Sequence, residues 1–336
     1  MSILRQATII LMLSVAALLP AQTRKELHSI GFYNLENLFD TIHDAGKNDY
    51  EYLPKGVNRW NSEKYTNKIK NIAATLAGIG AGEQPSGATA IGVCEVENSN
   101  VLDDLIKSPQ IARKGWKYIH MESDDSRGID CALLYDPTRF TPKEKQLIPY
   151  GNNRKTRGFL TISGTICGEQ LHIIVNHWPS RYSKSPAREA AAEKVKAIKD
   201  SIIRRHPTSK VIIMGDFNDN PDNKSLKETL QAKQEITAAT KSSDLYNPFW
   251  NKLRKEKQGT IVYRDRWQLY DQIILSGQLC NKKGKGLKYI KSEIHRPPHL
   301  INDKGRYKGY PKRTHAGGEW LNGYSDHLPV VIYLGK

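Results

Sequence analysis

The stretch VIIMGDFNDNP, residues 211–221, joins four consecutive apolar residues to a short polar run that contains Asp216 and Asn218. An apolar run of this length that ends at Gly is typical of a buried strand, so the polar residues stand at the strand's end. A strand end held by a sheet is a rigid place from which carboxylate and amide groups can act. The stretch therefore predicts a sheet strand that presents polar chemistry.

A second junction of this kind stands near the C-terminus, where an Asp326-His327 pair comes just before the apolar run 330–334. A single Asp-His pair is more often part of a turn than a catalytic pair, so the other strand ends decide its interpretation. The same junction recurs four more times, at Asn34 with Glu36, at Glu95, at Asn176 with His177, and at Asp271.

Six junctions of one kind in a single chain favour a shared chemical role. Metal-assisted hydrolysis of a phosphate ester needs oxygen ligands for a hard cation, hydrogen-bond donors for phosphoryl oxygens, and an imidazole for proton transfer. Carboxylates, amides and histidines at strand ends supply all three. The pattern therefore predicts a hydrolase.

Short strand candidates recur along the chain with helical patterns between them. The two clearest helices are expected at residues 62–77 and 187–204. No internal repeat and no flexible linker divides the sequence, so we expect one mixed α/β domain over residues 22–336. The strand candidates are residues 29–33, 90–94, 131–135, 159–166, 171–175, 211–214, 272–275 and 330–334.

The N-terminal segment predicts the compartment. Arg5 precedes an apolar run at residues 7–19, and Ala21 offers a small residue for signal peptidase. The run is too short for a transmembrane helix, which needs ~20 residues, and is typical of a secretory signal. We expect a signal peptide at residues 1–21 and a secreted or periplasmic protein, with an uncleaved anchor as the alternative. No later stretch is apolar enough to span a bilayer.

The mature chain is expected to be soluble and strongly basic. The 336 residues include 51 Lys and Arg against 35 Asp and Glu, which gives a formal net charge of +16, and the mean hydropathy is −0.59. Such a surplus favours a polyanionic partner, because phosphate groups that bind Lys and Arg release condensed counterions. A generally basic, soluble surface is the alternative.

The four cysteines show no metal-binding or disulfide spacing. Cys94, Cys131, Cys167 and Cys280 contain no CxxC motif, and the first three lie in apolar runs typical of strands. We expect buried free thiols, and one disulfide stays open as an alternative.

Two polar segments are predicted to be loops. Residues 40–60 are rich in Gly and Asn, and residues 277–323 show little periodicity. Within residues 281–313 there are 11 Lys or Arg residues against two acidic residues, a net charge of +9. This basic stretch separates the last two junctions, so we expect it at the rim of any site that they share.

In chain order, the six junctions resemble the motifs of the endonuclease/exonuclease/phosphatase superfamily, which includes DNase I-like nucleases and Mg-dependent apurinic endonucleases. The resemblance covers residues 29–334. It implies an α/β fold of four layers, an α/β/β/α sandwich of two packed mixed sheets flanked by helices, with the site at one edge of the sheets. The stretch NHWPSR at residues 176–181, Arg313-Thr314 and GYSDH at residues 323–327 are similar to a group of secreted bacterial members described as endonucleases.

The resemblance also implies a divalent-metal site. Glu95 matches the principal metal ligand of the family, and Glu36 and Asp326 match carboxylates that complete or orient the site. The implied cofactor is Mg²⁺, with Mn²⁺ or Ca²⁺ as substitutes. Cys94 stands where the family usually has Gln, which puts a hydrogen bond to the site in doubt but leaves the Glu95 ligand in place.

The catalytic roles follow from the same resemblance. Asn34 and Asn218 are expected to hold phosphoryl oxygens or the attacking water. Asp216 and His327 are the candidates for activating that water, and Asp271 is expected to orient an imidazole.

A second histidine completes the predicted site. His177 matches the catalytic histidine of the DNase I-like branch and is expected to donate a proton to the leaving group, although which histidine is acid and which is base stays open. Asn176, Arg181 and Arg313 are the residues expected to bind substrate.

The leading hypothesis is an exported Mg²⁺-dependent phosphodiesterase, an endonuclease of low specificity that hydrolyses DNA or RNA. One alternative is a sphingomyelinase-like or phosphoinositide-directed phosphoesterase of the same fold. The other is a noncatalytic polyanion-binding protein. Nucleic acid is the expected partner, no protein partner is implied, and a monomer is the default.

Overall fold

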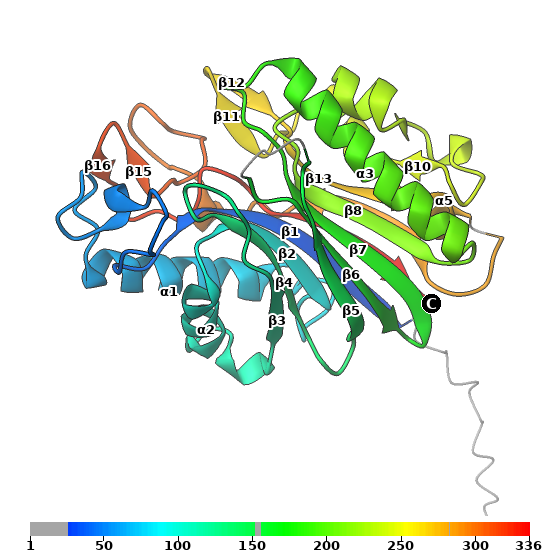
Figure 1. Ribbon diagram of the computed structural model, residues 1–336, viewed down its shortest axis with the longest axis horizontal. Helices are drawn as coiled ribbons and strands as arrows, with labels where there is room; N and C mark the ends of the chain where they lie inside the picture. Colours follow the sequence, from blue (N-terminus) through cyan, green and yellow to red (C-terminus); the bar gives the residue numbers. More distant parts are fainter. Residues whose placement is uncertain (1–25, 152–155, 282) are drawn as a thin grey trace, which may run out of the picture.

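Two β-sheets packed face to face form the centre of the molecule, and helices cover their outer faces (Figure 1). The structure is a computed structural model that describes residues 26–151, 156–281 and 283–336. The predicted signal peptide at residues 1–21 lies outside the described residues. Among the helices that are described, none has the length and apolar character needed to cross a membrane.

The first sheet has six strands, and its central pair runs parallel. In that pair Ile30 lies beside Ala90, and Asn34 lies beside Cys94. Both central strands are buried on both faces, which explains why residues 30–33 and 90–94 contain no polar residues and do not alternate. The strand order is β14 (Lys288–Ile294), β17 (Val330–Gly335), β1 (Leu27–Leu38), β2 (Ala90–Val96), β4 (Asp130–Tyr135) and β3 (Lys117–His120).

The second sheet has seven strands and contains another parallel pair, in which His177 lies beside Asp216. The next strand is antiparallel and places Asp271 directly beside Asp216. Three predicted site residues are thus neighbours in one sheet. The strand order is β5 (Thr141–Ile148), β6 (Phe159–Ile166), β7 (Glu169–His177), β8 (Lys210–Asp216), β13 (Asp271–Ser276), β10 (Leu245–Tyr246) and β9 (Ala232–Lys233).

Amphipathic helices cover the outer face of each sheet. On the first sheet lies α1 (Ser62–Gly78), which begins where the Asn61 side chain accepts a hydrogen bond from the Lys64 N–H, and α2 (Ser99–Lys107) packs beside it. On the second sheet lies α3 (Ser185–Arg205), rich in Ala. Helix, sheet, sheet and helix make four layers, so the predicted sandwich is confirmed.

Short elements connect these layers. The 3-10 turns are η1 (Tyr50–Tyr52), η2 (Ala112–Lys114), η4 (Ile236–Ala238) and η5 (Pro298–Leu300), and η3 (Ser225–Thr229) is a single π-helical turn. The remaining helices are α4 (Trp250–Arg254) and α5 (Gly277–Cys280). Two small hairpins are formed by β11 (Ile261–Tyr263) with β12 (Arg266–Gln268), and by β15 (His315–Ala316) with β16 (Glu319–Trp320).

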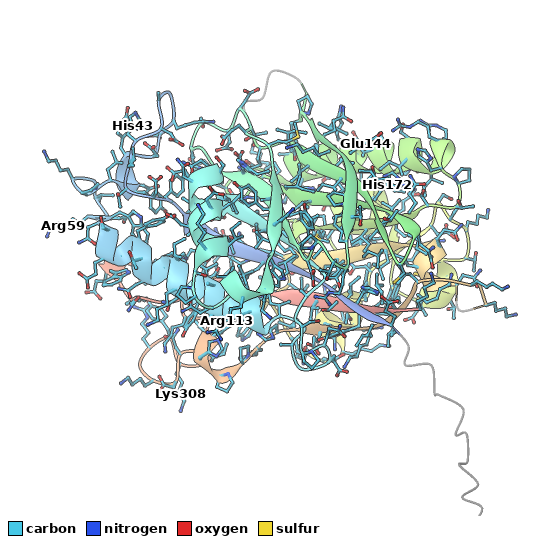
Figure 2. The ribbon with its side chains drawn as sticks, turned by 90° about the horizontal axis from the view of Figure 1, so that it is seen from below. His43, Arg59, Arg113, Glu144, His172 and Lys308 are labelled. Atoms are coloured by element: carbon cyan, nitrogen blue, oxygen red, sulfur yellow. The ribbon has the colours of Figure 1, made fainter. Side chains whose placement is uncertain are left out.

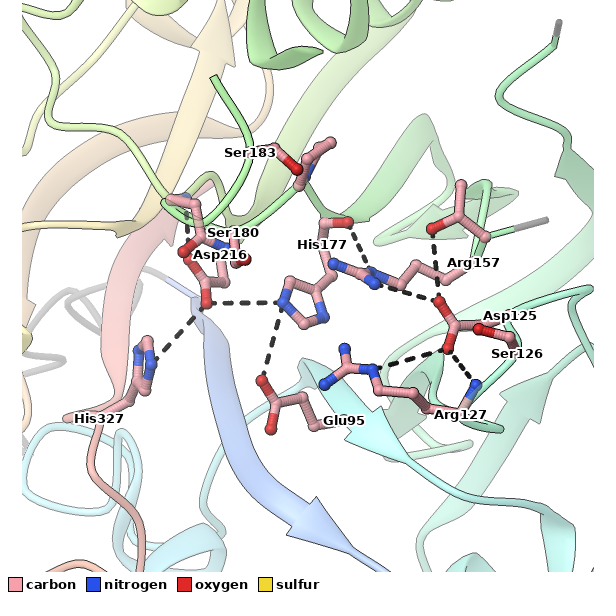
Figure 3. A pocket seen from close by; sticks show the side chains of 13 residues that line it. Glu95, Asp125, Ser126, Arg127, Arg157, His177, Ser180, Ser183, Asp216 and His327 are labelled. Carbon is pink, nitrogen blue, oxygen red and sulfur yellow. Dashed lines mark hydrogen bonds and ion pairs between the residues drawn. The ribbon is translucent and has the colours of Figure 1, made fainter. Parts of the chain in front are cut away.

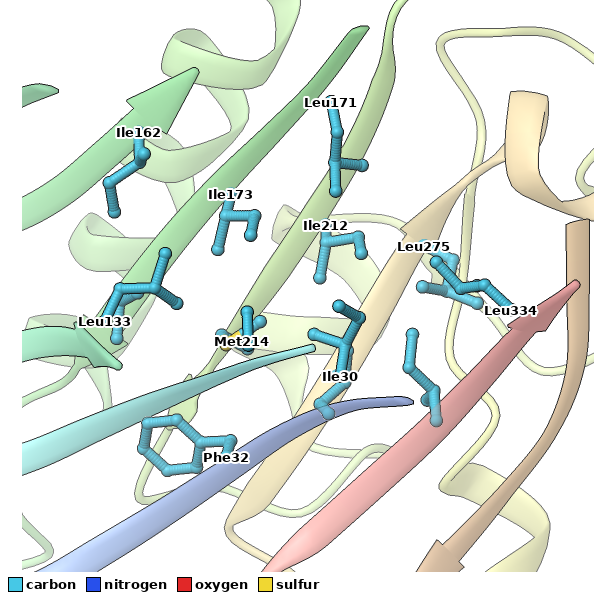
Figure 4. Packing of buried hydrophobic residues seen from close by; sticks show 14 of the residues in the cluster. Ile30, Phe32, Leu133, Ile162, Leu171, Ile173, Ile212, Met214, Leu275 and Leu334 are labelled. Carbon is cyan, nitrogen blue, oxygen red and sulfur yellow. The ribbon is translucent and has the colours of Figure 1, made fainter. Parts of the chain in front are cut away.

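The main core lies between the two sheets. Figure 4 shows Ile30 and Phe32 of β1 facing Ile212 and Met214 of β8, and all four side chains are fully buried. At Gly92 an added Cβ would lie 2.5 Å from the Met214 sulfur of the facing sheet. A larger residue at this position would therefore press against the second sheet.

All eight predicted strand cores and both predicted helices are observed, but the loop prediction for residues 277–323 was wrong in part. This segment contains β14, an edge strand that pairs with β17. The sequence of β14 hid it because Lys and Glu alternate with its apolar residues, as is common where an edge strand must resist pairing with another chain. The charged edge strand β5 was missed for the same reason.

The position of one cysteine also differs from the prediction. Cys94, Cys131 and Cys280 are buried free thiols, as expected. Cys167 is only partly buried and lies in the turn between β6 and β7, not in a strand. Strand β6 ends one residue earlier, at Ile166.

Replacing Gly92 with Ala should destabilise the fold by about 1–3 kcal/mol, because the new methyl group would overlap Met214 in a packed core. Urea unfolding measures this change as a lower transition midpoint. Gly82→Ala is the matched control, since nothing lies within 4 Å of the position of its Cβ. Equal midpoints for the two variants would show that the sheets do not need the close approach at Gly92.

Candidate functional site

Four central strands bring polar side chains from distant parts of the sequence to one edge of the sheets. Asn34 and Glu95 lie near the ends of β1 and β2, and His177 and Asp216 end β7 and β8. Both pairs of strands are parallel, so their carboxyl ends meet at the same edge. Figure 3 shows Glu95, His177, Asp216 and His327 around one hollow.

Three residues at this edge have a left-handed backbone. The φ angles are 50° for Glu36, 61° for Glu95 and 52° for Asn218. Such angles are uncommon outside Gly and cost of order ~1 kcal/mol or more, so they persist where the surroundings impose them. Strain of this kind clusters at functional sites, and here it falls on three predicted site residues.

Asn34 joins the two sheets at this edge. Its amide nitrogen donates to Glu95 Oε1 at 3.0 Å and to Asp216 Oδ2 at 3.0 Å. The side chain is fully buried, and both amide hydrogens are used. Asn34 therefore positions two carboxylates, and the predicted contact from its amide to phosphoryl oxygens is not available.

His327 and Asp271 form a buried pair beside these carboxylates. His327 Nδ1 lies 2.7 Å from Asp271 Oδ2, and its Nε2 lies 3.8 Å from Asp216 Oδ2. Burial alone would lower the pKa of His327, but Asp271 and Asp216 more than offset it and raise that pKa well above 6.5. The contact with Asp271 therefore fixes the orientation of the His327 ring and favours its protonated form.

The pKa shifts of Asp216 and His177 each favour the uncharged form of the side chain. Burial, with the negative charges of Asp271 and Glu95, raises the pKa of Asp216 to about 7, although His327 acts in the opposite direction. Burial and two nearby Arg side chains lower the pKa of His177 well below 6.5. At neutral pH the site thus holds a neutral His177 and a carboxyl group poised to exchange its proton.

One group of donor atoms fits a divalent cation. Glu95, His177 and Asp216 each offer a ligand atom, and these atoms lie within 4.8 Å of one another. His177 Nε2 is the nitrogen that faces these carboxylates, at 3.7 Å from Glu95 Oε1 and 3.8 Å from Asp216 Oδ2. The two carboxylates are oxygen ligands of the kind that Mg²⁺ and Mn²⁺ prefer, whereas imidazole is a more usual ligand of softer transition metals.

The other two predicted metal ligands lie outside that group. The Glu36 carboxylate accepts a hydrogen bond from the Thr314 N–H at 2.6 Å and lies 3.9 Å from Lys68 Nζ. Asp326 pairs with Arg313 at 2.8 Å. That Glu36 and Asp326 complete or orient the metal site therefore stays a prediction, and in the structure these two carboxylates lie beside Lys68 and Arg313.

Asn218 lies where the sequence predicted it. Its N–H donates to Asp216 Oδ1 at 2.9 Å, and its side-chain amide donates to the Trp178 carbonyl at 3.1 Å. Asn218 also lines the hollow, so its second amide hydrogen remains for a ligand.

Two of the predicted substrate-binding residues have other partners. Asn176 is fully buried, donates to the Ile174 and Met214 carbonyls, and accepts from the Trp178 indole. Arg181 forms an ion pair with Asp219 and lies outside the lining of the hollow. Both residues support the strand edge, and neither faces the hollow, in contrast to the prediction.

The hollow beside the cluster has a volume of about 470 Å³ and includes residues that sequence reasoning missed. Arg157 is buried, pairs with Asp125 at 3.1 Å and donates to the His177 carbonyl at 3.0 Å. Arg127 also lines the wall and is 47% exposed in its side chain. No motif marked these residues, because they come from loops that the fold alone brings to the site.

A second, smaller hollow of about 180 Å³ lies on the other side of Asp326-His327. Asp326 and Arg313 line it, whereas His327 lines the first hollow. Arg313 is 44% exposed in its side chain, so the predicted substrate-binding role fits its position. The remaining lining residues are Val262, Arg264, Asp265, Asn302, Tyr307, Tyr310, Pro311 and Leu321.

Comparison with known proteins gives one family and one fold. Residues 29–336 match the Endonuclease/Exonuclease/phosphatase family. No curated protein sequence matches the chain. Among solved structures, ANGEL2, described as a 2′,3′-cyclic phosphatase, has a TM-score of 0.60 at 13% identity and covers 93% of this chain and 96% of its own.

Two further structures have the same fold. A mannosyl-6-phosphatase of Bacteroides thetaiotaomicron has a TM-score of 0.56 at 15% identity, covering 91% of this chain and 99% of its own. TDP2 of D. rerio, solved with a single-strand DNA product, has a TM-score of 0.55 at 13% identity, covering 92% and 99%. At these identities the likeness shows a shared fold and leaves the substrate to be argued from the site.

Replacing Asp271 with Asn should lower the pKa of His327 by at least about one unit, because the closest negative charge is removed. Imidazole resonances followed by NMR titration measure this shift. Asp124→Asn is the control, since that carboxylate is exposed and has no contact with His327. An unchanged titration of His327 in Asp271→Asn would contradict the pairing.

The same pair predicts how stability depends on pH. Because the folded-state pKa of His327 exceeds 6.5, its contribution to stability is complete below pH 6.5 and is lost as the pH rises toward the folded-state value. The stability difference between wild type and Asp271→Asn, measured by urea unfolding, should therefore shrink as the pH is raised above 6.5.

Proposed function

The chain belongs to the endonuclease/exonuclease/phosphatase family, and on that premise we propose that it is an exported, Mg²⁺-dependent phosphodiesterase that cleaves DNA or RNA with little base specificity. Members of this family are phosphoesterases, so membership supports a hydrolase of phosphate esters. The choice of nucleic acid as the substrate rests on the site itself and on the charge around it.

The observation that carries the proposal is the buried cluster in which Asn34 holds Glu95 and Asp216 together, next to the His327–Asp271 pair. The Glu95 carboxylate is the group that would hold Mg²⁺, and Asp216 and His177 lie beside it. When bound, the cation would polarise the phosphate and offset charge on the leaving oxygen.

The chain's own residues supply the proton transfers. Asp216, with a pKa of about 7, is suited to accept the proton of an attacking water near neutral pH. The His327 imidazolium directs Nε2 toward the same place and can donate to a phosphoryl oxygen. Asn218 has one amide hydrogen left for the phosphate.

The surroundings of the site favour a polymer over a small ester. Hollows lie on both sides of Asp326-His327, so an extended backbone can cross the pair. Residues 295–313 carry six Lys or Arg residues and one acidic residue, a net charge of +5. Tyr307 is 40% exposed and lines the second hollow, where an aromatic ring can stack on a base.

The basic segment does not all lie at the rim, in contrast to the prediction. β14 runs between its two halves, and Lys288 pairs in register with Gly335 whereas Ile294 pairs with Val330. Lys283 and Lys285 therefore lie at the opposite end of the sheet from His327. Of this segment, only residues after β14 line the second hollow, and Lys308, labelled in Figure 2, belongs to this part.

The two alternatives have less support. A sphingomyelinase-like enzyme needs an apolar hairpin that inserts into a membrane, but the β11–β12 hairpin ends in Arg264-Asp265 and the β15–β16 hairpin ends in two glycines. A noncatalytic binding protein would be expected to lack part of the cluster, and each predicted junction retains its polar residues.

The test of the proposed function is a panel of divalent metals against plasmid DNA, single-stranded RNA, sphingomyelin and inositol phosphates. We expect EDTA-sensitive cleavage of nucleic acid with Mg²⁺ or Mn²⁺. Glu95→Gln and His327→Ala should each reduce turnover by about 10²–10⁴-fold while nucleic-acid binding is retained. Glu144→Gln, on the remote edge strand β5, is the control and should keep full activity.

Two outcomes of this panel would contradict the proposal. Cleavage of a lipid head group or a small ester with intact DNA and RNA would refute the nuclease and leave the hydrolase. Unchanged cleavage by Glu95→Gln would show that the cluster is not the site.

The rim charges can be tested separately. Arg306→Glu combined with Lys308→Glu should weaken nucleic-acid binding by about tenfold or more. The slope of log Kd plotted against the logarithm of the salt concentration should fall by roughly two. Both side chains are exposed. Lys283→Glu combined with Lys285→Glu makes the same change of charge at the far end of β14, and equal effects of the two double variants would exclude a local rim contact.

Export and oligomeric state belong to the proposal as well. The signal-like segment at residues 1–21 supports secretion or delivery to the periplasm, and a monomer remains the default.

A further inference from the structure

A second cluster of ligand atoms lies away from the site. Glu26, His28 and Cys167 each offer one ligand atom, and these atoms lie within 4.8 Å of one another. His28 Nε2 is 3.0 Å from Cys167 Sγ and 3.4 Å from Glu26 Oε1. Neither the family match nor the proposed reaction gives this cluster a role.

The cluster is remote from the candidate functional site. His28 is the second residue of β1, and Asn34 lies six residues further along the same strand, which corresponds to roughly 20 Å at ~3.3 Å per residue. Cys167 lies in the turn of the β6–β7 hairpin, whose second strand ends at His177. Figure 1 shows the C-terminus at this end of the sandwich, and Lys336 Nζ donates to the Cys167 carbonyl.

The backbone at Cys167 is unusual for a cysteine. Cys167 and Gly168 form a two-residue turn between β6 and β7, with φ angles of 51° and 76°. Two positive φ angles in such a turn favour Asn-Gly or Asp-Gly, and other side chains are strained there. A cysteine held in this conformation points to a use for its sulfur.

His28 is oriented as a ligand histidine would be. The side chain is 1% exposed, and its Nδ1 lies 3.2 Å from the Thr89 hydroxyl, which leaves Nε2 facing Cys167 and Glu26. A hydrogen bond at one ring nitrogen that fixes the other toward the ion is the usual arrangement around protein-bound metals.

Nearby positive charges are partly balanced. Lys336 Nζ lies 3.4 Å from Glu169 Oε1, and Arg139 is paired with Asp136 at 2.8 Å. Neither cation forms an ion pair with the three ligand groups.

We propose that Glu26, His28 and Cys167 form a second metal site, which takes a thiophilic divalent ion such as Zn²⁺ and links the first strand of one sheet to a hairpin of the other. Ligand atoms around tetrahedral Zn²⁺ lie roughly 3.3–3.7 Å apart, given bonds of about 2.0–2.3 Å. The His28–Glu26 distance already meets this requirement, and the His28–Cys167 distance requires a small outward movement of the sulfur. Water completes the fourth position.

Binding breaks the Cys167 S–H bond and forms a metal–sulfur bond, and the proton leaves to solvent. No oxidant or reductant takes part. The metal must displace the thiol proton, so binding should strengthen as the pH rises.

Another group of potential ligands, His120 with Glu122 and Asp130, has no sulfur. His120 Nε2 already lies within hydrogen-bonding distance of Asp130 Oδ2, at 3.0 Å. The candidate functional site also lacks a thiol among its donors. A metal–thiolate signal would therefore distinguish the proposed site from both.

The test is a titration of the metal-free full chain with Co²⁺, which gives a sulfur-to-metal charge-transfer absorption only when a thiolate is bound. We expect a band that saturates at one equivalent, is displaced by Zn²⁺ and is absent from Cys167→Asn. Asn suits the left-handed turn, so this variant should fold with an unchanged or higher unfolding midpoint without metal. Cys280→Ser, which removes a buried thiol elsewhere, should keep the band.

A second variant tests the carboxylate. Glu26 is exposed, so Glu26→Gln should fold normally and weaken Co²⁺ binding at least about tenfold. No band in the wild-type protein, or a band that persists in Cys167→Asn, would overturn the proposal. An unchanged Co²⁺ affinity in Glu26→Gln would remove Glu26 from the site.

Discussion

The arrangement at the sheet edge depends on one buried amide. Asn34 of the first sheet donates to Glu95 of the same sheet and to Asp216 of the second. Without these two hydrogen bonds, two carboxylates would lie close together in a buried place, and their repulsion and desolvation would separate the strand ends. The amide therefore holds the sheets together at the point where the apolar core ends, and it keeps both carboxylates directed toward one place.

The charges around Asn34 follow from that constraint. Burial raises the pKa of Asp216, and Asp271 on the neighbouring strand adds to the same effect. The same two carboxylates raise the pKa of His327, whereas burial, with the charges of Arg157 and Arg127, lowers the pKa of His177. The site is thus divided into an acidic centre and a basic wall. A bound cation and a phosphate group match these two parts, because the cation meets the carboxylates and the phosphate meets the arginines.

Sequence reasoning predicted the strands that are buried on both faces, because a continuous apolar run has few other interpretations. It missed β5 and β14, where charged side chains protect an exposed edge and hide the strand pattern. Within the site it predicted the residues at strand ends but not their partners. Asn176 sits in the right motif yet points into the core, and Arg157 comes from a loop without a motif. Which face a residue presents at a strand end depends on how the strand pairs and packs in the sheet, and no local pattern specifies that.

Close packing in the core explains how so few hydrogen bonds can hold the site residues in fixed positions. Gly92 lets Met214 approach β2 without a side chain between them, so the spacing of the two sheets is fixed by close packing a short distance below the cluster. Asn34, Glu95 and Asp216 extend from those same strands. A displacement of one sheet would have to move the packed core as well as the hydrogen bonds. The positive φ angles at Glu36 and Glu95 then redirect the chain immediately beyond the core, so the strain is located where rigid strands give way to reactive side chains.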